Sequence, residues 1–427
     1  MNDEREIPTG RLARLAKLVS VGARTGASLL MSRDGSGAAE HAAQVLGSLR
    51  GLAAKVGQMA SYVDGFVPEE HRAAYEGAMS KLQSAAPQSC TAAIRALVES
   101  ELGAPIETAF ARWEDAPFAS ASIGQVHRAT LHDGRDVAVK VQHPGIERAI
   151  ESDLRNAGVI EGLVGTLAPK GIGVHEAFAV VSQRFREELD YELEATRQEQ
   201  FQRIHAGDPA IRIPTVVRER SARRVLTSSF EHGITLDEAA TADPALRTTW
   251  AEVLWRFVFR GNLVGEMFNA DPHPGNYLFR PDGTIVFLDF GCVQPIVDPE
   301  LSNARAVHRA ALAKDEAAFA RASARLLGTR GGSFQTAALA YVRRCFEPIF
   351  VSPFRIDRAY VTEVVRGIQD LKKFMFAKDK SFVALPPGLV FMNRLQFGFY
   401  SVLARLDVPV DYAAVERGIL GDAGLLE

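Results

Sequence analysis

Hydrophobic positions follow a helical period at the start of the chain and a strand period after about residue 113. From Leu46 to Val63, apolar residues recur with a period near 3.6, which predicts a long amphipathic helix. Similar spacing predicts helices at residues 69–84 and 89–103. Between residues 118 and 141, short apolar runs separated by small-residue turns predict three strands instead. The chain therefore opens with helices and continues into a sheet.

Helical periodicity returns in the second half of the chain. Two short strands are expected at residues 214–217 and 224–227. One helix is expected before these strands, at residues 186–196, and others after them, at residues 250–265, 299–313, 315–327, 333–345, 357–375 and 386–406. A sheet region followed by a run of helices indicates the α+β class. The expected regions are a helical N-terminal extension (1–112), a small lobe (113–231) and a large, mostly helical lobe (232–427).

Polar residues stand at the ends of a predicted buried hairpin, whose apolar runs at residues 277–279 and 285–288 flank an Asp-Gly turn. Asp271 lies five positions before Asn276, and Asp289-Phe290-Gly291 follows 13 residues after Asn276. Protein kinases carry D-x-x-x-x-N and D-F-G in this order as catalytic and metal-binding loops. Asp271 would accept a proton from an attacking hydroxyl, while Asn276 and Asp289 are oxygen ligands suited to Mg²⁺ on nucleotide phosphates. The ordered spacing disfavours the alternative, a hairpin with ordinary surface polar residues.

A lysine on the third predicted strand supplies an upstream partner for this pattern. Val137-Ala138-Val139-Lys140 resembles the kinase V-A-I-K, whose lysine binds the nucleotide's phosphates. The preceding turn has no glycine-rich loop, but small residues still let the backbone approach phosphates. Those turn residues are Ala119, Ser120, Ala121 and Ser122.

A kinase lysine also needs a glutamate partner on a helix. The acidic helix predicted at residues 186–196 offers four candidates, and several of them are expected to form only a solvated face. Spacing alone does not choose among Glu187, Glu188, Glu192 and Glu194.

The composition excludes some functional classes but does not identify a reaction. The 427 residues are 47% apolar and 24% charged, as in ordinary globular proteins, and the net charge of −3 implies no general attraction to nucleic acid. Three distant cysteines form neither a disulfide framework nor a zinc pattern, which favours a reducing, cytoplasmic setting. No run reaches the roughly 18 uncharged apolar residues that a membrane span requires. The acidic start lacks the apolar block of a signal peptide.

The segment from Ile7 to Arg33 carries five basic residues and no acidic ones, with leucines and valines between them. Two interpretations stand equally. A basic amphipathic helix can lie on an anionic membrane surface, as a peripheral contact. It can also pack on its own domain with a solvated basic face.

With these motifs in order, the chain resembles the UbiB-type (aarF-domain) atypical kinase-like family of ubiquinone biosynthesis, from about residue 46 to about residue 406. Lys55-Val56-Gly57-Gln58 is similar to its K-x-G-Q motif, residues 119–122 to its alanine-rich loop, and Glu188-Leu189-Asp190 to its E-x-D motif. From physical chemistry alone, the ammonium group of Lys55 is expected to extend into solvent. The resemblance instead implies that Lys55 contacts Glu188, with the N-terminal helix folded over the substrate cleft. It also implies that Glu194 is the partner of Lys140.

The resemblance implies a two-lobed protein-kinase-like fold that uses ATP and Mg²⁺, with weak ATPase activity and poor phosphorylation of other proteins. The expected function is an atypical kinase or ATPase that supports isoprenoid-quinone or related lipid metabolism. The expected partners are ATP, a lipid or quinone-precursor ligand and an anionic membrane surface, without nucleic acid. Asn269 departs from the family, which usually has His two residues before the catalytic Asp. We expect this change to affect turnover more than nucleotide binding.

Two other functional classes remain open. The stretch from Asp271 to Asn276 also resembles the catalytic loop of small-molecule phosphotransferases of the aminoglycoside and choline kinase kind. Asn269 and the missing glycine-rich loop are the grounds for a third hypothesis, a non-enzymatic pseudokinase that binds nucleotide.

Overall fold

The computed structural model describes residues 89–121, 123–152, 154–155, 182–376, 381, 383 and 398–426. These residues belong to two compact units. The first unit comprises Met1–Ala195 and Thr215–Phe230, and the second comprises Thr196–Pro214 and Glu231–Glu427. The helices predicted before residue 89, with Lys55, lie outside the described residues, and so does Ser122. The predicted region boundaries at residues 112 and 231 stay predictions.

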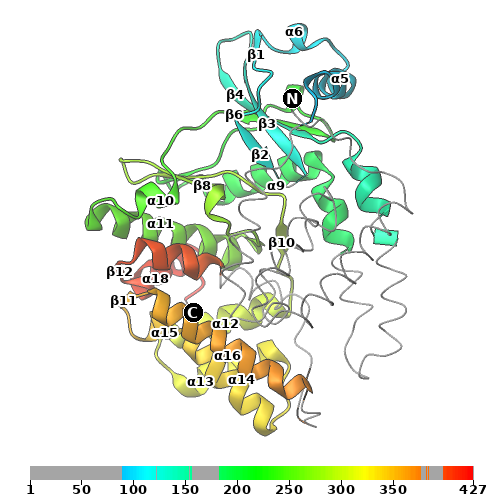
Figure 1. Ribbon diagram of the computed structural model, residues 1–427. Helices are drawn as coiled ribbons and strands as arrows, with labels where there is room; N and C mark the ends of the chain where they lie inside the picture. The colour runs from blue at the N-terminus through cyan, green and yellow to red at the C-terminus, as the bar shows by residue number, and fades with distance from the viewer. Residues whose placement is uncertain are drawn as a thin grey trace, which may run out of the picture. The chain divides into compact units, whose positions relative to one another are not determined.

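The first unit is built on an antiparallel sheet with the order β1-β3-β4-β6, in which β2 also pairs with β3 (Figure 1). Helices α5 (Thr91–Leu102) and α6 (Ile106–Ala109) precede it. The strands are β1 (Arg112–Trp113), β2 (Ala119–Ala121), β3 (Gly124–Thr130), β4 (Asp136–Gln142) and β6 (Val225–Ser229). The three strands expected between residues 118 and 141 are thus confirmed.

Strand β4 has the alternation expected of a strand that buries one face. Val137, Val139 and Val141 are at most 1% exposed, and they join α5 in one apolar cluster. Lys140 is only partly buried, as its place on the opposite face requires. A second cluster, which contains Ile123, Tyr191 and Leu226, forms the other part of this unit's core.

The second unit is mostly helical, as expected. Helix α9 (Tyr191–Ile204) begins in the first unit and enters the second unit at Thr196. The other described helices of the second unit are α10 (Leu236–Ala239), α11 (Pro244–Leu263), α12 (Glu300–Leu312), α13 (Glu316–Leu327), α14 (Gly332–Cys345), α15 (Glu347–Phe350), α16 (Arg358–Phe376) and α18 (Tyr412–Asp422). Within this unit α12 packs on α13, α14 on α16, and α11 on α18 (Figure 1). No helix of the described residues has the length and apolar character to cross a membrane.

Short strands of the second unit carry the polar motif. Strands β8 (Tyr277–Phe279) and β9 (Ile285–Phe287) form the predicted antiparallel hairpin, and β5 (Ile211–Arg212) runs parallel to β9. Strands β7 (Met267–Asn269) and β10 (Val293–Pro295) pair antiparallel, as do β11 (Phe354–Arg355) and β12 (Pro409–Val410).

Two predicted elements differ from the structure. Residues 214–217 form no strand, only an isolated bridge at Val216. Proline has no N–H to donate to a ladder, and the carbonyl of Pro214 accepts side-chain hydrogen bonds from Gln198 and Gln202 instead. The helix predicted at residues 186–196 is broken after Glu188. There the Asp190 carboxylate accepts a hydrogen bond from the Leu193 amide and starts α9 anew.

An aromatic cluster in the second unit encloses His205, which is 2% exposed. Its ring stacks on Phe201 and on Phe257, with centroids 6.1 and 4.9 Å away. Neither ring nitrogen has a hydrogen-bond partner in the described part of the chain. Burial, together with the nearby Arg260 charge, lowers the pKa of His205 to about 3. The folded protein therefore holds this imidazole neutral.

Replacing His205 with Phe should make stability less dependent on pH. Below an unfolded-state pKa of about 6.5, the unfolded chain takes up a proton that the folded chain refuses, so the free energy of unfolding falls as pH falls. Between pH 7.5 and 5.0, the wild type should lose about 2 kcal/mol more than His205→Phe. Urea unfolding at both pH values measures this. The exposed His132→Phe serves as control and should behave as wild type. An identical pH dependence in wild type and His205→Phe would contradict the assignment.

Candidate functional site

Lys140 on β4 forms an ion pair with Glu194 on α9, in the first unit. The Lys140 Nζ to Glu194 Oε1 distance is 2.7 Å, and the side chains are 17% and 3% exposed. Lys140 Nζ also lies 5.0 Å from the centre of the Tyr191 ring, within cation–π range. Of the four glutamates that spacing left open, the structure thus pairs Glu194 with Lys140. The role of the pair in nucleotide binding stays a prediction.

The small-residue turn lies on the same sheet as Lys140. Ala119 pairs with Val126 on β3, and Val126 pairs with Lys140 on β4. Ala119 and Ser120 are exposed, and Ala121 is half-buried. At Gly124, a Cβ atom would lie 2.3 Å from the Val141 carbonyl oxygen, so only glycine fits where the two strands meet. The register therefore brings small, accessible backbone close to the lysine strand.

Glu188 is half-buried at the end of the short helix that precedes α9. In the same E-x-D motif, the Leu189 carbonyl accepts a hydrogen bond from the side-chain amide of Gln142 at 2.8 Å. The Asp190 carboxylate accepts from the Leu193 backbone amide at the start of α9. The motif thus helps to fix the helix that bears Glu194. Because Lys55 lies outside the described residues, its contact with Glu188 stays a prediction.

In the second unit, one side-chain amide joins the loop of Asp271 to the loop of Asp289, which are the predicted catalytic and metal-binding loops. Asn269 Nδ2 donates to the Asp289 carbonyl at 2.5 Å, and Asn269 Oδ1 accepts from the Asp271 amide at 3.1 Å. The β7–β10 pairing places Val293 opposite Asn269 and aligns the same segments. The asparagine that departs from the family pattern therefore holds both loops by its side chain.

Further hydrogen bonds hold the two expected metal ligands. Asn276 Nδ2 donates to the Asp271 carbonyl at 3.1 Å, while the Asn276 carbonyl accepts from the Leu288 amide at 3.0 Å. One carboxylate oxygen of Asp289 accepts from the Gly291 amide at 2.9 Å. These contacts bring Asp271, Asn276 and Asp289 into one hydrogen-bonded constellation.

Two residues that the sequence pattern did not single out anchor the metal-binding loop. Arg197, on α9, donates to the Gly291 carbonyl at 3.2 Å and is 8% exposed. Phe201, also on α9, packs against the fully buried Phe290, with ring centroids 5.1 Å apart. Their contacts reach about 90 residues along the chain, and no local spacing signals such a pair. In the sequence, the position of Arg197 about one helical turn after Glu194 was the available sign that it lies on the same helix face as that glutamate.

The oxygen ligands present suit Mg²⁺. The amide nitrogen of Asn276 is held by a carbonyl, which turns the amide oxygen the other way. Mg²⁺ prefers carboxylate and amide oxygens, and commonly binds one or two of them together with phosphate oxygens and water. Beside these groups, burial and the charge of Asp271 both raise the pKa of Tyr277, so this phenol stays protonated. Asn276 and Asp289 would thus hold the metal, without help from a tyrosinate.

Comparison with known proteins gives consistent matches. The family model for the ABC1 atypical kinase-like domain matches residues 81–323, more than half of the chain. The chain is 31% identical over 310 residues to the mitochondrial atypical kinase COQ8B of Rattus norvegicus. The aligned region covers 67% of this chain and 57% of that protein. It is 29% identical over 360 residues to the probable protein kinase UbiB of Marinobacter nauticus. The aligned region covers 79% of this chain and 62% of that protein. The chain spans about half the length of the curated relatives it matches.

A solved structure is similar over nearly the whole chain. It is the complex of Rv3197 with erythromycin from Mycobacterium tuberculosis, with a TM-score of 0.63 and 26% sequence identity. The match covers 98% of this chain and 100% of the other.

Removing the lysine of the buried pair should destabilise the protein. Lys140→Met leaves the Glu194 carboxylate buried without its cation, which should lower the free energy of unfolding by about 3 kcal/mol. Adding Glu194→Gln should recover at least half of that loss, because the buried charge is then gone. Urea unfolding curves of the two variants measure both effects.

The control is Lys373→Met, which breaks an exposed pair with Asp370 and should cost at most about 0.5 kcal/mol. Equal effects of Lys140→Met and Lys373→Met would show that the buried pair is no more important for stability than a surface pair.

Proposed function

The chain belongs to the ABC1 atypical kinase-like family, and from this premise we propose that it binds ATP with Mg²⁺ and transfers the terminal phosphoryl group to water or to a small acceptor. The family match confirms the resemblance inferred from the motifs, and with it the α+β, kinase-like fold. One observation carries the proposal. The Asn269 side chain ties the Asp271 loop to the Asp289 loop, as a phosphoryl-transfer site requires.

The proposed roles follow from the motif to which each group belongs. Asp271 accepts the proton of the attacking water or hydroxyl. Asn276 and Asp289 hold Mg²⁺, which when bound neutralises charge that develops on the phosphates. In the first unit, Lys140, oriented by Glu194, binds phosphate oxygens, and the turn from Ala119 to Ser122 lets the backbone approach them. Lys55 and Glu188 would form the contact that keeps large acceptors away from Asp271.

The phosphoryl acceptor, the metabolic role and the location of the protein in the cell have weaker support. The relatives named COQ8 and UbiB support a role in isoprenoid-quinone or related lipid metabolism. The basic segment from Ile7 to Arg33 supports peripheral contact with an anionic membrane. A cytoplasmic location of this chain stays a prediction, and the rat and yeast relatives are named as mitochondrial.

The pseudokinase hypothesis loses one of its grounds. Its two grounds were Asn269 in place of the usual histidine and the missing glycine-rich loop. The asparagine makes hydrogen bonds to both loops, so the substitution leaves them connected. This favours turnover over nucleotide binding alone. The hypothesis of a small-molecule phosphotransferase keeps the same roles for Asp271, Asn276 and Asp289. It differs from the leading proposal in the acceptor and in the Lys55 helix over the cleft, which such enzymes lack.

The proposal predicts Mg²⁺-dependent ATP hydrolysis by the purified full chain. Asp289→Asn should lower kcat by about 100-fold, because it removes a negative metal ligand. The matched control is Asp282→Asn in the exposed hairpin turn, which should leave kcat unchanged. Phosphate release is measured with and without anionic liposomes.

Two outcomes would count against this function. If wild type and Asp289→Asn are equally inactive under every condition, the chain is not an ATPase. If the wild type binds Mg²⁺-ATP without turning it over, the pseudokinase hypothesis is favoured instead. Faster turnover with amino-alcohol acceptors would select the small-molecule phosphotransferase.

A further inference from the structure

His273 lies between Asp271 and the proposed metal ligand Asn276, on the same loop of the second unit. Its ring nitrogen Nδ1 accepts a hydrogen bond from the Gly275 backbone amide at 3.0 Å. The ring thereby caps a single 3₁₀ turn, η2 (Pro274–Asn276). The backbone carbonyl of His273 accepts from the Asn276 amide at 2.9 Å. The ring and the backbone of His273 therefore both contact the turn that bears the Asn276 side chain.

Most of this loop has little backbone freedom. Proline fixes its own φ near −65° and restricts the residue before it to extended conformations. Pro272 and Pro274 thus restrict Asp271 and His273 as well as themselves. Gly275 is the exception, because glycine has the widest range of backbone conformations to lose on folding. This glycine directly precedes the proposed metal ligand.

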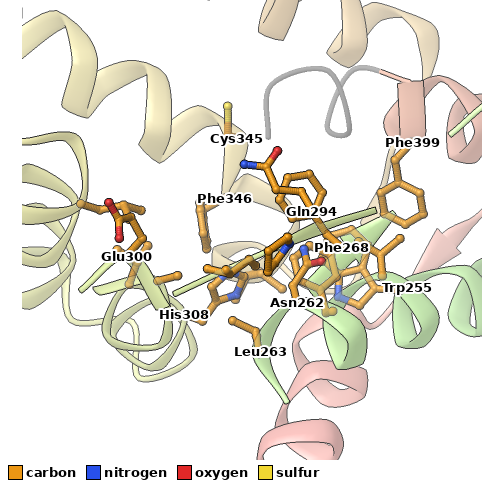
Figure 2. A pocket seen from close by; sticks show the side chains of 18 of the residues that line it. Trp255, Asn262, Leu263, Phe268, Gln294, Glu300, His308, Cys345, Phe346 and Phe399 are labelled. Atoms are coloured by element: carbon orange, nitrogen blue, oxygen red, sulfur yellow. The ribbon is translucent and has the colours of Figure 1, made fainter. Parts of the chain in front are cut away.

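The start of the loop is also held by tertiary packing, through a helix at residues 398–406. A Cβ atom on Gly398 would lie 2.3 Å from Pro272 Cγ, so the helix backbone touches the proline directly. The next residue, Phe399, packs on Trp255 with ring centroids 5.8 Å apart. Both rings belong to the wall of a cavity of about 290 Å³, which Asn262 also lines (Figure 2). Pro272 therefore rests on a well-anchored helix.

Gly275 has no comparable packing, and the ring of His273 is its nearest restraint. Gly275 is exposed. A Cβ atom built on it would meet His273 Nδ1 at 3.1 Å and Cε1 at 3.4 Å, and no other atom of the described residues beyond its chain neighbours within 4 Å. The imidazole acts here through an acceptor nitrogen, as the side-chain oxygen of Asn or Asp does at a helix N-cap.

We propose that His273 is a positioning residue for metal binding, whose ring holds the Gly275 amide so that the Asn276 side chain stays in place for Mg²⁺. The proposal rests on the proposed role of Asn276 as a metal ligand. Without the cap, the backbone at Gly275 samples more conformations, and only a fraction of the molecules holds Asn276 in place. The dissociation constant of the metal then rises by the inverse of that fraction.

The affinity for Mn²⁺ tests this role without catalysis, because Mn²⁺ prefers the same oxygen ligands as Mg²⁺ and is detected by electron paramagnetic resonance. The purified full chain is titrated with Mn²⁺ in the presence of adenylyl imidodiphosphate, a nucleotide analogue that resists hydrolysis. His273→Phe keeps a flat ring without the acceptor and should weaken Mn²⁺ binding about fivefold, as expected for a lost cap. His273→Leu is a second variant with the same expectation. His273→Asn supplies an acceptor oxygen and should stay within about twofold of wild type.

Two controls separate this role from a general effect on the fold. His132→Leu changes an exposed histidine of the first unit and should leave the affinity for Mn²⁺ unchanged. The affinity for the nucleotide analogue without metal should differ by less than about twofold among all variants, because the cap acts on the metal ligand. Circular dichroism checks that each variant is folded.

Three results would overturn the proposal. These are no saturable Mn²⁺ binding by the wild type, folded His273→Phe and His273→Leu variants that bind Mn²⁺ as the wild type does, or a His273→Asn variant as weak as those two. The predicted pattern of Mn²⁺ affinities in a protein that hydrolyses no ATP would support the role of His273 and count against the proposed phosphoryl transfer alone.

Discussion

One asparagine side chain holds together the two loops on which the proposed chemistry depends. Asn269 donates to the Asp289 carbonyl and accepts from the Asp271 amide, and so joins backbone segments 20 residues apart in sequence. The β8–β9 hairpin supplies the intervening chain, and Asn276 closes the constellation through the Asp271 carbonyl. A side chain with both a donor and an acceptor is required here, and a neutral amide supplies both without a change of protonation. Asn269 thus connects the two loops through its neutral amide.

Buried apolar contacts make that connection rigid. Phe290, in the middle of the metal-binding motif, is fully buried against Phe201, and Arg197 secures the following Gly291. In the first unit, the same logic applies to Lys140, whose charge is balanced by a glutamate that is itself almost fully buried. In each unit, a charged or polar group with a proposed chemical role is positioned by neighbours that exclude water, which strengthens electrostatic interactions.

The sequence predicted the helices and strands better than it predicted the contacts between distant segments. Periodicity located α11, α12, α13, α14 and α16 and the hairpin, because a buried face imposes its period on local sequence. The acids and the amide at the hairpin ends stand out in the sequence because their types and order are specific, and their chemical roles stay predictions. The break at Asp190 and the loss of a strand at Pro214 were missed, since a capping carboxylate and a carbonyl taken by side chains from α9 override local propensity. Arg197 and the cavity around Asn262 arise from distant segments, so no local pattern could reveal them.

The most direct test of this account is the Mg²⁺-dependent ATPase rate of Asn269 variants. Asn269→Ala removes both loop contacts and should lower kcat at least about tenfold. Asn269→His restores a ring N–H that can donate to the Asp289 carbonyl, and should remain within about threefold of wild type. Comparable thermal stability of the two variants would exclude unfolding as the cause. An Asn269→Ala enzyme as active as wild type would contradict the claim that this side chain holds the two loops in working order.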